Sequence, residues 1–483
     1  MIEFRPILYV LGIFLITLAI AMAVPVTFDL QAHSGDWQAF FFAMGVTGFF
    51  GILLVLTNRT ENDNLVLRPK QAFVLTTLAW VVLTAFAAIP FCASSLEMSF
   101  TDAYFEAMSG LTTTGASVIA DVQSSPPGIL VWRSLLVWMG GVGIIVMALS
   151  VLPMLRVGGM QLFRTEFSGQ DKHLPKIRQL AGSIIWVYLF LTFLCLLGYR
   201  FGGMNWFEAM NHAMTTLGTG GFSTFNTSFM DNTSDFAQYN ATFFMVVAAL
   251  PFALLARFAA GSWEVLWHDT QVRGFLLFVA AAMFVMSTYQ YMVNGESLAD
   301  AVRTGTFNVA AVISTTGYAN ADYNIWGPFA LVMFFFLTCV GGCAGSSSGG
   351  LKFYRFQILG SVAINQMRQL VNPNGVFVPH YNNRPLQNAV TFSVLSFFFV
   401  FALSFTLVAM MLAATGLDFM TAISASVAML ANVGPGLGLH IGPMGSYQPL
   451  PDTATWVCSV AMLLGRLELF TVLVLLMPGF WRW

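Results

Sequence analysis

The stretch that decides the fold is Phe105-Glu106-Ala107-Met108-Ser109-Gly110-Leu111-Thr112-Thr113-Thr114-Gly115, a short apolar segment that runs into a polar turn ending in glycine. Turns of the same kind fall between apolar spans at three further places. The four turns are Thr113-Thr114-Gly115, Thr219-Gly220-Gly221, Thr315-Thr316-Gly317 and Asn432-Val433-Gly434. Non-helical backbone is tolerated at membrane depth only where it is packed in protein or lines a water-filled cavity. The four turns together therefore predict one pore, and a small cation is its natural occupant.

The composition is that of a membrane protein with many spans. Of the 483 residues, 57% are hydrophobic and 9% are charged, which is too apolar for a soluble fold. A helical span needs about 20 mostly apolar residues. Ten segments are candidates: 7–28, 38–57, 72–94, 129–153, 183–200, 240–258, 274–294, 328–345, 388–415 and 456–478. We therefore expect an all-α polytopic membrane protein whose even number of spans puts both termini on the same side.

The lysines and arginines indicate which side is cytoplasmic, because cytoplasmic connections carry the excess of positive charge. Most of the 20 basic residues fall on one side of the predicted spans, including Arg68, Lys352 and Arg355. The opposite connections hold acids, among them Asp29 and Glu106. We expect both termini to be cytoplasmic and the acids to form a negative outer mouth that attracts cations. The alternative is that these acids merely solvate the outer loops.

Two features of the sequence concern processing and cysteine chemistry. The apolar stretch from Ile7 to Val24 also fits a cleaved signal peptide with Ala21-Met22-Ala23 as its processing site, but its length favours a retained span. The five cysteines are scattered in or beside apolar spans. They form neither a disulfide framework nor a cluster with metal-ligand spacing.

The four turns belong to a repeat. Their glycines recur about every hundred residues, a period that fits one span, a re-entrant segment and a second span. The short segments before the turns are 101–111, 205–216, 297–313 and 417–430. The first two share Phe-Glu-Ala-Met, at residues 105–108 and 207–210, which we place at the same position ahead of the turn. Helix starts are predicted at Ser99 or Thr101, at Asn205, and at Ser297 with Asp300.

Four short helices that end at one axis would favour a cation. The unsatisfied carbonyl groups at a helix C-terminus carry about half a negative charge. Carbonyl groups of an extended turn can also replace the water shell of a partly dehydrated ion. Glycine is required there because it adopts backbone angles that are closed to other residues. A single Thr-Thr-Gly is more often simple packing between membrane helices, so the prediction depends on all four turns.

The chain resembles the TrkH, TrkG and KtrB superfamily of potassium transporters over essentially its whole length. The resemblance lies in residues 105–115 and in Gly220-Gly221-Phe222-Ser223-Thr224, Ser314-Thr315-Thr316-Gly317-Tyr318 and Asn432-Val433-Gly434-Pro435-Gly436-Leu437-Gly438. It implies four pseudo-fourfold repeats, each with a span, a pore helix with its filter strand, and a second span. The expected repeats are 71–180, 181–273, 274–387 and 388–483. Residues 1–70 then hold two extra transmembrane helices, as in the TrkH branch.

The same resemblance implies function, location and partners. It implies selective, gated, channel-like uptake of K+ as the transported ion across a bacterial cytoplasmic (inner) membrane. Members of the superfamily are homodimers on a ring of cytoplasmic nucleotide-binding regulatory subunits such as TrkA. This chain has no nucleotide-binding pattern of its own, so no organic cofactor and no nucleic acid are expected.

The turn sequences bear on which ion is selected and on register. Plant and fungal relatives can carry serine at the first filter glycine and then favour Na+, whereas this chain keeps Gly115. In the second turn, Leu217-Gly218-Thr219-Gly220-Gly221, an extra glycine leaves the register open by one residue.

A glycine- and serine-rich stretch interrupts the second span of repeat 3. It reads Gly341-Gly342-Cys343-Ala344-Gly345-Ser346-Ser347-Ser348-Gly349-Gly350. Such a sequence has poor helix propensity and cannot stay regular at membrane depth. By resemblance it is an intramembrane loop that lies under the filter and acts as a gate. The alternative is an ordinary flexible connection at the membrane surface.

Arg466 lies in the second span of repeat 4. A charge at the bilayer centre costs at least about 2.5 to 3.5 kcal/mol, so Arg466 should face a cavity or a partner. The resemblance places it near the ion path beneath the filter, where it would be an electrostatic barrier in the pore. The alternative is a structural ion pair with Glu468 or another buried acid.

The remaining charged and polar features carry weaker predictions. The basic stretch from Arg156 to Arg178 is a candidate docking face for a regulatory ring, although such a run is more often a solvated, topology-setting loop. The six histidines show no ligand spacing. No catalytic motif of a membrane-embedded enzyme is present. An alternating-access carrier also uses broken helices, but with two repeats rather than four.

Overall fold

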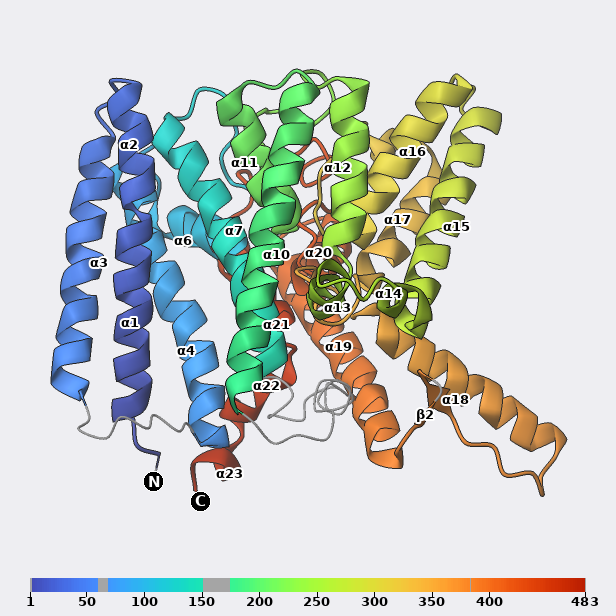
Figure 1. Ribbon diagram of the computed structural model, residues 1–483. Helices are drawn as coiled ribbons and strands as arrows, with labels where there is room; N and C mark the ends of the chain where they lie inside the picture. Colours follow the sequence, from blue (N-terminus) through green and yellow to red (C-terminus); the bar gives the residue numbers. More distant parts are fainter. Residues whose placement is uncertain (1, 60–67, 151–173, 383, 483) are drawn as a thin grey trace.

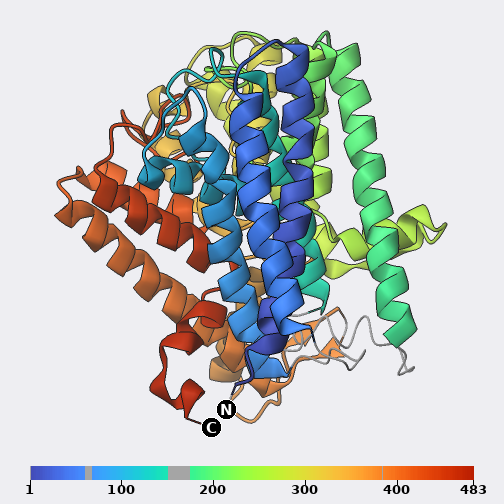
Figure 2. The same ribbon diagram turned by 90° about the vertical axis from the view of Figure 1, so that its left-hand side faces the viewer.

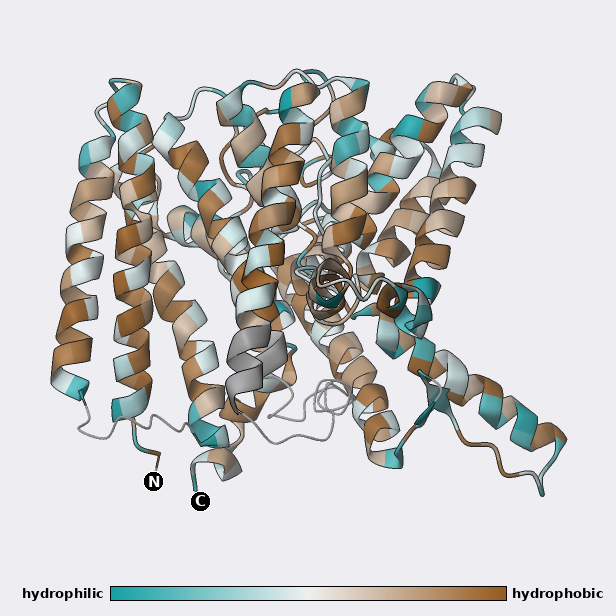
Figure 3. Cartoon of the chain, in the orientation of Figure 1, coloured by the Kyte–Doolittle hydropathy of each residue, from teal (hydrophilic) through white to brown (hydrophobic). Residues whose placement is uncertain are grey.

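The computed structural model describes residues 2–59, 68–150, 174–382 and 384–482, and these form a bundle of helices with both termini at the same end (Figure 1). The two strands in the described residues, β1 (His380–Tyr381) and β2 (Arg384–Pro385), form one antiparallel pair. Along the long N-terminal helices, hydrophilic residues gather near the upper ends and apolar residues lie between the ends (Figure 3). The expectation of an all-α polytopic membrane protein is confirmed.

The N-terminal helices form a hairpin outside the bundle (Figure 2). They are α1 (Arg5–Ala21), α2 (Ala23–Gln31) and α3 (Trp37–Asn58). Helices α1 and α3 approach closely at two glycines, because a Cβ atom added to Gly12 would lie 2.8 Å from the carbonyl oxygen of Gly51. Small residues allow this close approach between helices that gain little from apolar burial in lipid.

The rest of the described chain forms four repeats. The first spans of the repeats are α4 (Pro69–Ala87), α10 (Leu174–Phe201), α15 (Thr270–Met292) and α19 (Asn388–Ala414). The short helices that follow them are α6 (Phe100–Leu111), α11 (Trp206–Leu217), α16 (Leu298–Ile313) and α20 (Phe419–Leu430). The second spans begin with α7 (Pro127–Ser150), α12 (Asp235–Ala248), α17 (Pro328–Val340) and α21 (Asp452–Arg466).

Shorter helices connect or extend these elements. They are α5 (Ile89–Ala93), α13 (Phe252–Ala259), α14 (Glu264–His268), η1 (Tyr323–Ile325), α18 (Phe353–Val371), α22 (Phe470–Leu473), η2 (Val474–Leu476) and α23 (Pro478–Trp481). Helix α18 runs away from the bundle toward the lower right of Figure 1.

Three of the ten predicted spans are sharply bent or end early. The described residues contain seven helices that are long and apolar enough to cross a membrane. The predicted span 240–258 is bent by 102° between α12 and α13, and the predicted span 456–478 is bent by 104° between α21 and α22. The span 328–345 stops being helical at Val340. Pro251, which lacks an N–H, breaks the first of these, and left-handed Glu468 and Leu469 break the second.

The predicted starts of the short helices are confirmed in three repeats. Ser99, Asn205 and Ser297 are N-cap residues whose side-chain oxygens accept the N–H three residues on, from Asp102, Glu208 and Asp300. The fourth start is Asp418, which accepts from the N–H of Thr421. A side-chain oxygen therefore satisfies an otherwise unpaired N–H at the start of every short helix.

Candidate functional site

Each short helix ends in the same reversal of the chain. The residue two positions before the glycine is left-handed in every repeat, with φ of 53°, 52°, 59° and 54° at Thr113, Thr219, Thr315 and Asn432. The next N–H donates to the carbonyl oxygen five residues back, as from Thr114 to Ser109 over 2.8 Å and from Val433 to Ala428 over 2.9 Å. This is the Schellman motif, in which glycine is the usual left-handed residue. A β-branched threonine is strained there, and three of the four turns keep one.

The four glycines form a closed ring, in which each glycine contacts the backbone of the turn in the next repeat. A Cβ atom added to Gly115 would lie 2.9 Å from the carbonyl carbon of Gly220 and nearer still to its oxygen. The corresponding carbonyl oxygens at the other three contacts belong to Thr316 for Gly221, Val433 for Gly317 and Thr114 for Gly434. The last of these contacts returns to repeat 1, so the backbones of the four turns meet around one centre.

The ring opens into a cavity on one side. This cavity of about 120 Å³ is lined by all four glycines, Gly115, Gly221, Gly317 and Gly434, and by the segments that follow them. Its wall also includes Arg133 and Tyr447. The hydroxyl group of Tyr447 donates to the carbonyl oxygen of Gly434 over 2.8 Å, so the fourth turn differs from the others in this contact.

The structure settles the register of the second turn. Gly218 is the C-cap residue of α11, and Thr219 is the left-handed residue that corresponds to Thr113. Gly221 therefore corresponds to Gly115, and the extra glycine is Gly218. The four turns therefore align residue by residue, from the left-handed residue to the glycine two positions later.

The Phe-Glu-Ala-Met recurrence, in contrast, does not mark equivalent positions. Glu208 is the N3 residue of α11 and forms a capping box with Asn205, whereas the corresponding N3 residue of α6 is Asp102. Glu106 lies one turn deeper, fully buried, and its Oε1 accepts from Nε of Arg133 over 2.7 Å. Our placement of the two motifs at the same position was wrong, because the N-caps rather than the four-residue motifs align the helices.

The predicted set of outer acids needs a further correction. Asp29 is buried in α2, where its Oδ1 accepts from the N–H of Gly128 over 2.8 Å. Glu106 is neutralised by Arg133, which lies within α7 and not in an outer connection. Arg303 is paired with Asp235 and Asp300. The acids therefore include structural partners as well as residues free to set the field at the mouth.

The polar loop at residues 341–350 is buried beneath the ring. Ser346, Ser347 and Ser348 are at most 1% exposed, so the alternative of a flexible surface connection is wrong. The backbone is non-helical between the end of α17 and the start of α18. Its buried polar groups bond to one another and to the ends of neighbouring helices, as Ser346 does to the carbonyl oxygen of Cys343 and the N–H of Cys343 does to the carbonyl oxygen of Ala249.

This loop contacts three of the four repeats. The N–H of Gly349 donates to Oγ1 of Thr315 over 2.7 Å, and the N–H of Gly350 donates to the carbonyl oxygen of Ala431 over 2.8 Å. The hydroxyl group of Ser347 donates to the carbonyl oxygen of Leu217 over 3.0 Å. The loop thus joins the ends of three short helices beneath the ring.

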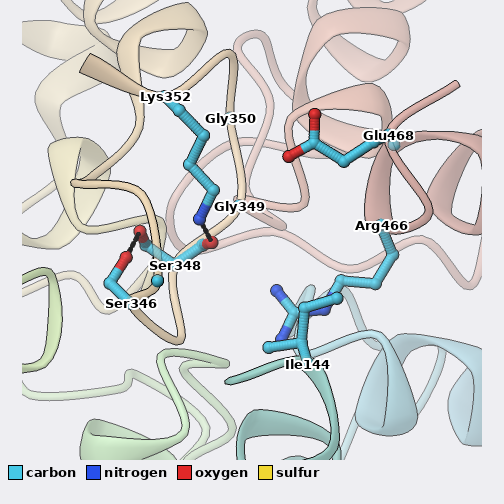
Figure 4. Close-up of a pocket in the computed structure, with 10 residues that line it drawn as sticks. Ile144, Ser346, Ser348, Gly349, Gly350, Lys352, Arg466 and Glu468 are labelled. Atoms are coloured by element: carbon cyan, nitrogen blue, oxygen red, sulfur yellow. Dashed lines mark hydrogen bonds between the residues drawn. The ribbon is translucent and has the colours of Figure 1, made fainter. Parts of the chain in front are cut away.

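Arg466 approaches this loop from the end of α21. Its Nη1 donates to the carbonyl oxygen of Ser347 over 2.9 Å, and the side chain is 3% exposed. Its Nε and Nη2 have no hydrogen-bond partner among the described residues. A cavity of about 20 Å³ separates the loop from α21, and Arg466, Lys352 and Glu468 line it. Figure 4 shows the guanidinium group pointing away from Glu468 and toward Ile144.

Glu468 is paired with a different arginine. The ion pair is with Arg355 in the first turn of α18, so the predicted alternative of an Arg466–Glu468 pair is wrong. Arg355 is fully buried, and its guanidinium group lies 3.7 Å from the ring centre of Phe397. Lys352, 7% exposed, donates to the carbonyl oxygen of Ser348. The charge pattern had suggested that Lys352 and Arg355 lie on a cytoplasmic surface. Both side chains are instead buried.

Sequence reasoning therefore missed two buried ion pairs, Arg133–Glu106 and Arg355–Glu468. Each has one partner in a short helix or a broken span, where a charge is expensive. This cost could have indicated the pairs from the sequence, since an isolated charge in a membrane segment requires a partner of opposite charge. The predicted docking stretch 156–178 lies mostly outside the described residues, which omit 151–173.

Comparisons with known proteins agree with this geometry. A family model described as "TrkH: Cation transport protein" matches residues 38–479. The chain is 42% identical to "Trk system potassium uptake protein TrkI" of Halomonas elongata, over 99% of this chain and 97% of that protein. It is 34% identical to "Trk system potassium uptake protein TrkH" of Escherichia coli, over 99% of this chain and 100% of that protein.

A solved structure is also similar over its whole length. The crystal structure of the potassium transporter TrkH from Vibrio parahaemolyticus matches with a TM-score of 0.92 at 32% sequence identity, and the match covers 100% of both chains. The similarity therefore extends over all four repeats and the N-terminal hairpin.

Proposed function

This chain belongs to the TrkH family of cation transport proteins, and we propose that it takes up K+ across the cytoplasmic membrane through a selective, gated pore. The observation that carries this proposal is the closed ring of Gly115, Gly221, Gly317 and Gly434, in which each glycine meets a carbonyl oxygen of the next repeat. The protein is a multi-pass membrane transporter and not an enzyme, as the members of its family are transporters.

K+ is held at the ring by backbone oxygen atoms and helix ends. The turns Thr113–Gly115, Thr219–Gly221, Thr315–Gly317 and Asn432–Gly434 form the filter. Four short helices end at the ring, and each C-terminus contributes about half a negative charge. Carbonyl oxygens replace the water that the ion loses on entry. Because every glycine touches a neighbouring backbone, no side chain can be added at these positions without moving the ring.

The loop 341–350 is the gate beneath the filter. Its hydrogen bonds to Thr315, Ala431 and Leu217 join three repeats in the arrangement described here. Opening the path requires these bonds to break together, which makes the loop a two-position element rather than a gradual constriction. The glycines at both ends of the loop, Gly341 and Gly350, have φ of 71° and 75° and suit a hinge.

Arg466 is an electrostatic barrier in this closed arrangement. Among the described residues its guanidinium group has no acidic partner beside the gate, since its acidic neighbour Glu468 is paired with Arg355. The hydrogen bond to Ser347 holds the guanidinium group in place. A cation leaving the ring is repelled by its charge. Movement of the loop would release Arg466 and lower the barrier.

The expected partners follow the family. We propose a homodimer in which each protomer has its own pore, on a cytoplasmic nucleotide-binding subunit like TrkA, in the bacterial inner membrane with both termini cytoplasmic. The relatives are named as components of a Trk system, which supports association with other subunits. The repeats are proposed at 71–180, 181–273, 274–387 and 388–483.

Isotope flux in proteoliposomes tests the function. Purified protein should take up ⁸⁶Rb+ in exchange for internal K+, with unlabelled K+ competing strongly and Na+ and Li+ weakly. Equal competition by K+, Na+ and Li+ would refute a K+ filter. Single-channel currents that rise in proportion to ion concentration would support continuous conduction, whereas strictly saturating, counter-ion-dependent turnover would favour an alternating-access carrier.

A further inference from the structure

In each repeat a polar side chain of the short helix reaches the segment that follows the turn. The position nine residues before the filter glycine holds Glu106, His212 and Asn308 in repeats 1 to 3. In repeat 4 it holds Ala425, and the adjacent Ser424 makes the contact instead. Four tethers therefore join helix to filter exit, and each has a different chemistry.

The tether of repeat 1 is a buried ion pair. Oε2 of Glu106 accepts from the N–H of Val118 over 3.0 Å, and Oε1 accepts from the hydroxyl group of Ser117 over 3.0 Å. Nε of Arg133 donates to Oε1 of Glu106 over 2.7 Å, and its Nη2 donates to Oγ of Ser117 over 3.1 Å. Both charged side chains are at most 3% exposed.

Arg133 also crosses to the next repeat. Its Nη1 donates to the carbonyl oxygen of Ser223 over 3.2 Å, and its guanidinium carbon lies 4.0 Å from the ring centre of Phe222. These two residues directly follow Gly221. One ion pair thus fixes the strands that leave the filter in two adjacent repeats.

The other three tethers are neutral and local. In repeat 2, Nδ1 of His212 faces the carbonyl oxygen of Glu208 at 2.9 Å and must carry the hydrogen, so Nε2 accepts from Ser223 at 3.0 Å. In repeat 3, Nδ2 of Asn308 donates to Oδ1 of Asn320 over 2.6 Å.

The repeat 4 tether consists of two bonds to one residue. The hydroxyl group of Ser424 donates to the carbonyl oxygen of Leu437 over 3.0 Å and accepts from its N–H over 2.9 Å. None of the three neutral tethers makes as many polar contacts as the Glu106–Arg133 pair, and none reaches the neighbouring filter segment through a charged group.

We propose that Glu106 and Arg133 are positioning residues that set the selectivity of the filter for K+ over Na+, an inference that rests on the proposed function. A ring of carbonyl oxygens discriminates against a smaller ion only if the ring resists closing around it. Rigid packing gives that resistance, because strands held by several bonds have few alternative positions. The Glu106–Arg133 ion pair supplies this resistance for half of the ring, which is formed by the strands of repeats 1 and 2.

The double variant Glu106→Leu/Arg133→Met separates this role from a purely structural one. Apolar residues of similar volume often preserve stability when they replace a buried ion pair as a unit, and this variant leaves no unpaired charge. We expect the protein to fold and to conduct, while the ratio of ⁸⁶Rb+ to ²²Na+ uptake falls about tenfold, as expected for the loss of one or more buried hydrogen bonds.

Two single variants test the effect of an unpaired charge and provide a matched control. Glu106→Gln leaves Arg133 unpaired beside the cavity that the four filter glycines line, and it should lower the uptake of both cations as well as the ratio. Glu208→Gln changes the identical Phe-Glu-Ala-Met motif at the helix start, where glutamine preserves the capping box. It should keep the natural uptake ratio.

The outcomes distinguish this inference from the proposed function. If the natural chain does not favour Rb+ over Na+, the proposed function fails. If the natural chain is selective and the folded double variant, monodisperse in detergent, is equally selective, the inference is wrong. Should the double variant not fold, Ser117→Ala removes only the hydroxyl group shared by Glu106 and Arg133. It should lower the ratio about threefold, and an unchanged ratio there would also overturn the proposal.

Discussion

Replacing Arg466 should raise cation flux through the closed protein, and two substitutions can show why. Arg466→Met removes both the charge and the hydrogen bond to the carbonyl oxygen of Ser347. Arg466→Gln removes the charge but keeps an N–H that can still donate to Ser347. If the charge is the barrier, both variants conduct faster. If the bond holds the gate, only the methionine variant does.

The expected size follows from the position of the charge. The adjacent Gly465 packs against the end of α20, because an added Cβ atom would lie 2.7 Å from the carbonyl carbon of Leu430 and 2.9 Å from Oδ1 of Asn432. The guanidinium group lies beneath the ring, where it donates to the carbonyl oxygen of Ser347 in the loop. Two unit charges at about 8 Å repel by about 2 kcal/mol at an effective dielectric constant of about 20. Removing this repulsion should raise the flux about 30-fold.

The assay is ⁸⁶Rb+ uptake by proteoliposomes without any regulatory subunit. Thermal unfolding of each variant in detergent is the control, and Arg466→Met should not lower Tm, because a buried charge with two unpartnered nitrogen atoms is lost with it. A folded Arg466→Gln protein with natural flux would refute the barrier. A folded Arg466→Met protein with natural flux would refute both the charge barrier and the role of the hydrogen bond to Ser347 in holding the gate.

Four further outcomes are expected. Gly115→Ser should lower the ratio of Rb+ to Na+ uptake, because the new Cβ atom would lie 2.9 Å from the carbonyl carbon of Gly220; a natural ratio would contradict the ring. Gly349→Ala should displace the gate and raise Rb+ flux, since its Cβ atom would lie 3.0 Å from that of Asn432; unchanged flux in folded protein would count against a gate. Replacing K+ by N-methylglucamine should lower Tm, because an ion bound at 100 times its Kd stabilises the native state by about 2.7 kcal/mol; equal Tm values in K+ and the organic cation would argue against a binding site. Hydrogen bonds from Asn226 and Ser124 lower the pKa of Asp121 from its ordinary 3.8, so the stabilisation is present above that value and is lost as the pH falls through the lowered pKa. The Tm difference between the natural chain and Asn226→Ala should therefore shrink between pH 6 and pH 3, and a difference that grows on acidification would overturn this assignment.

Much of the architecture could be predicted from local patterns. The length of the apolar segments and the four glycine turns predicted a helical membrane protein with four repeats. The register of three turns followed as well, since glycine is the residue that accepts the backbone conformation found at Gly115, Gly317 and Gly434. The register of the second turn stayed open by one residue until the structure placed Gly221. The composition of the segment 341–350 predicted that it cannot stay helical at membrane depth. Its burial beneath the filter was expected only from the family resemblance, and a surface connection was left open as the alternative.

The predictions failed where partners far apart in the sequence decide the outcome. Phe-Glu-Ala-Met occurs twice with the same letters, yet Glu208 caps a helix and Glu106 is buried against Arg133. The difference depends on where each helix begins, and a four-residue match does not contain that information. Hydropathy also missed the bends at Pro251 and at Glu468, because both halves of each broken span are apolar.

The sequence by itself determined which segments enter the membrane and which of their residues turn the chain, because hydrophobicity and the steric freedom of glycine are properties of single residues. Only the tertiary structure decided which charges neutralise one another. Glu468 is two residues from Arg466 but pairs with Arg355, more than a hundred residues away. In the part of the chain that the structure describes, this leaves Arg466 without an acidic partner beside the loop. Pairing depends on distance in space and on the cost of burying an unpaired charge, and both are set only when the four repeats close around their common centre.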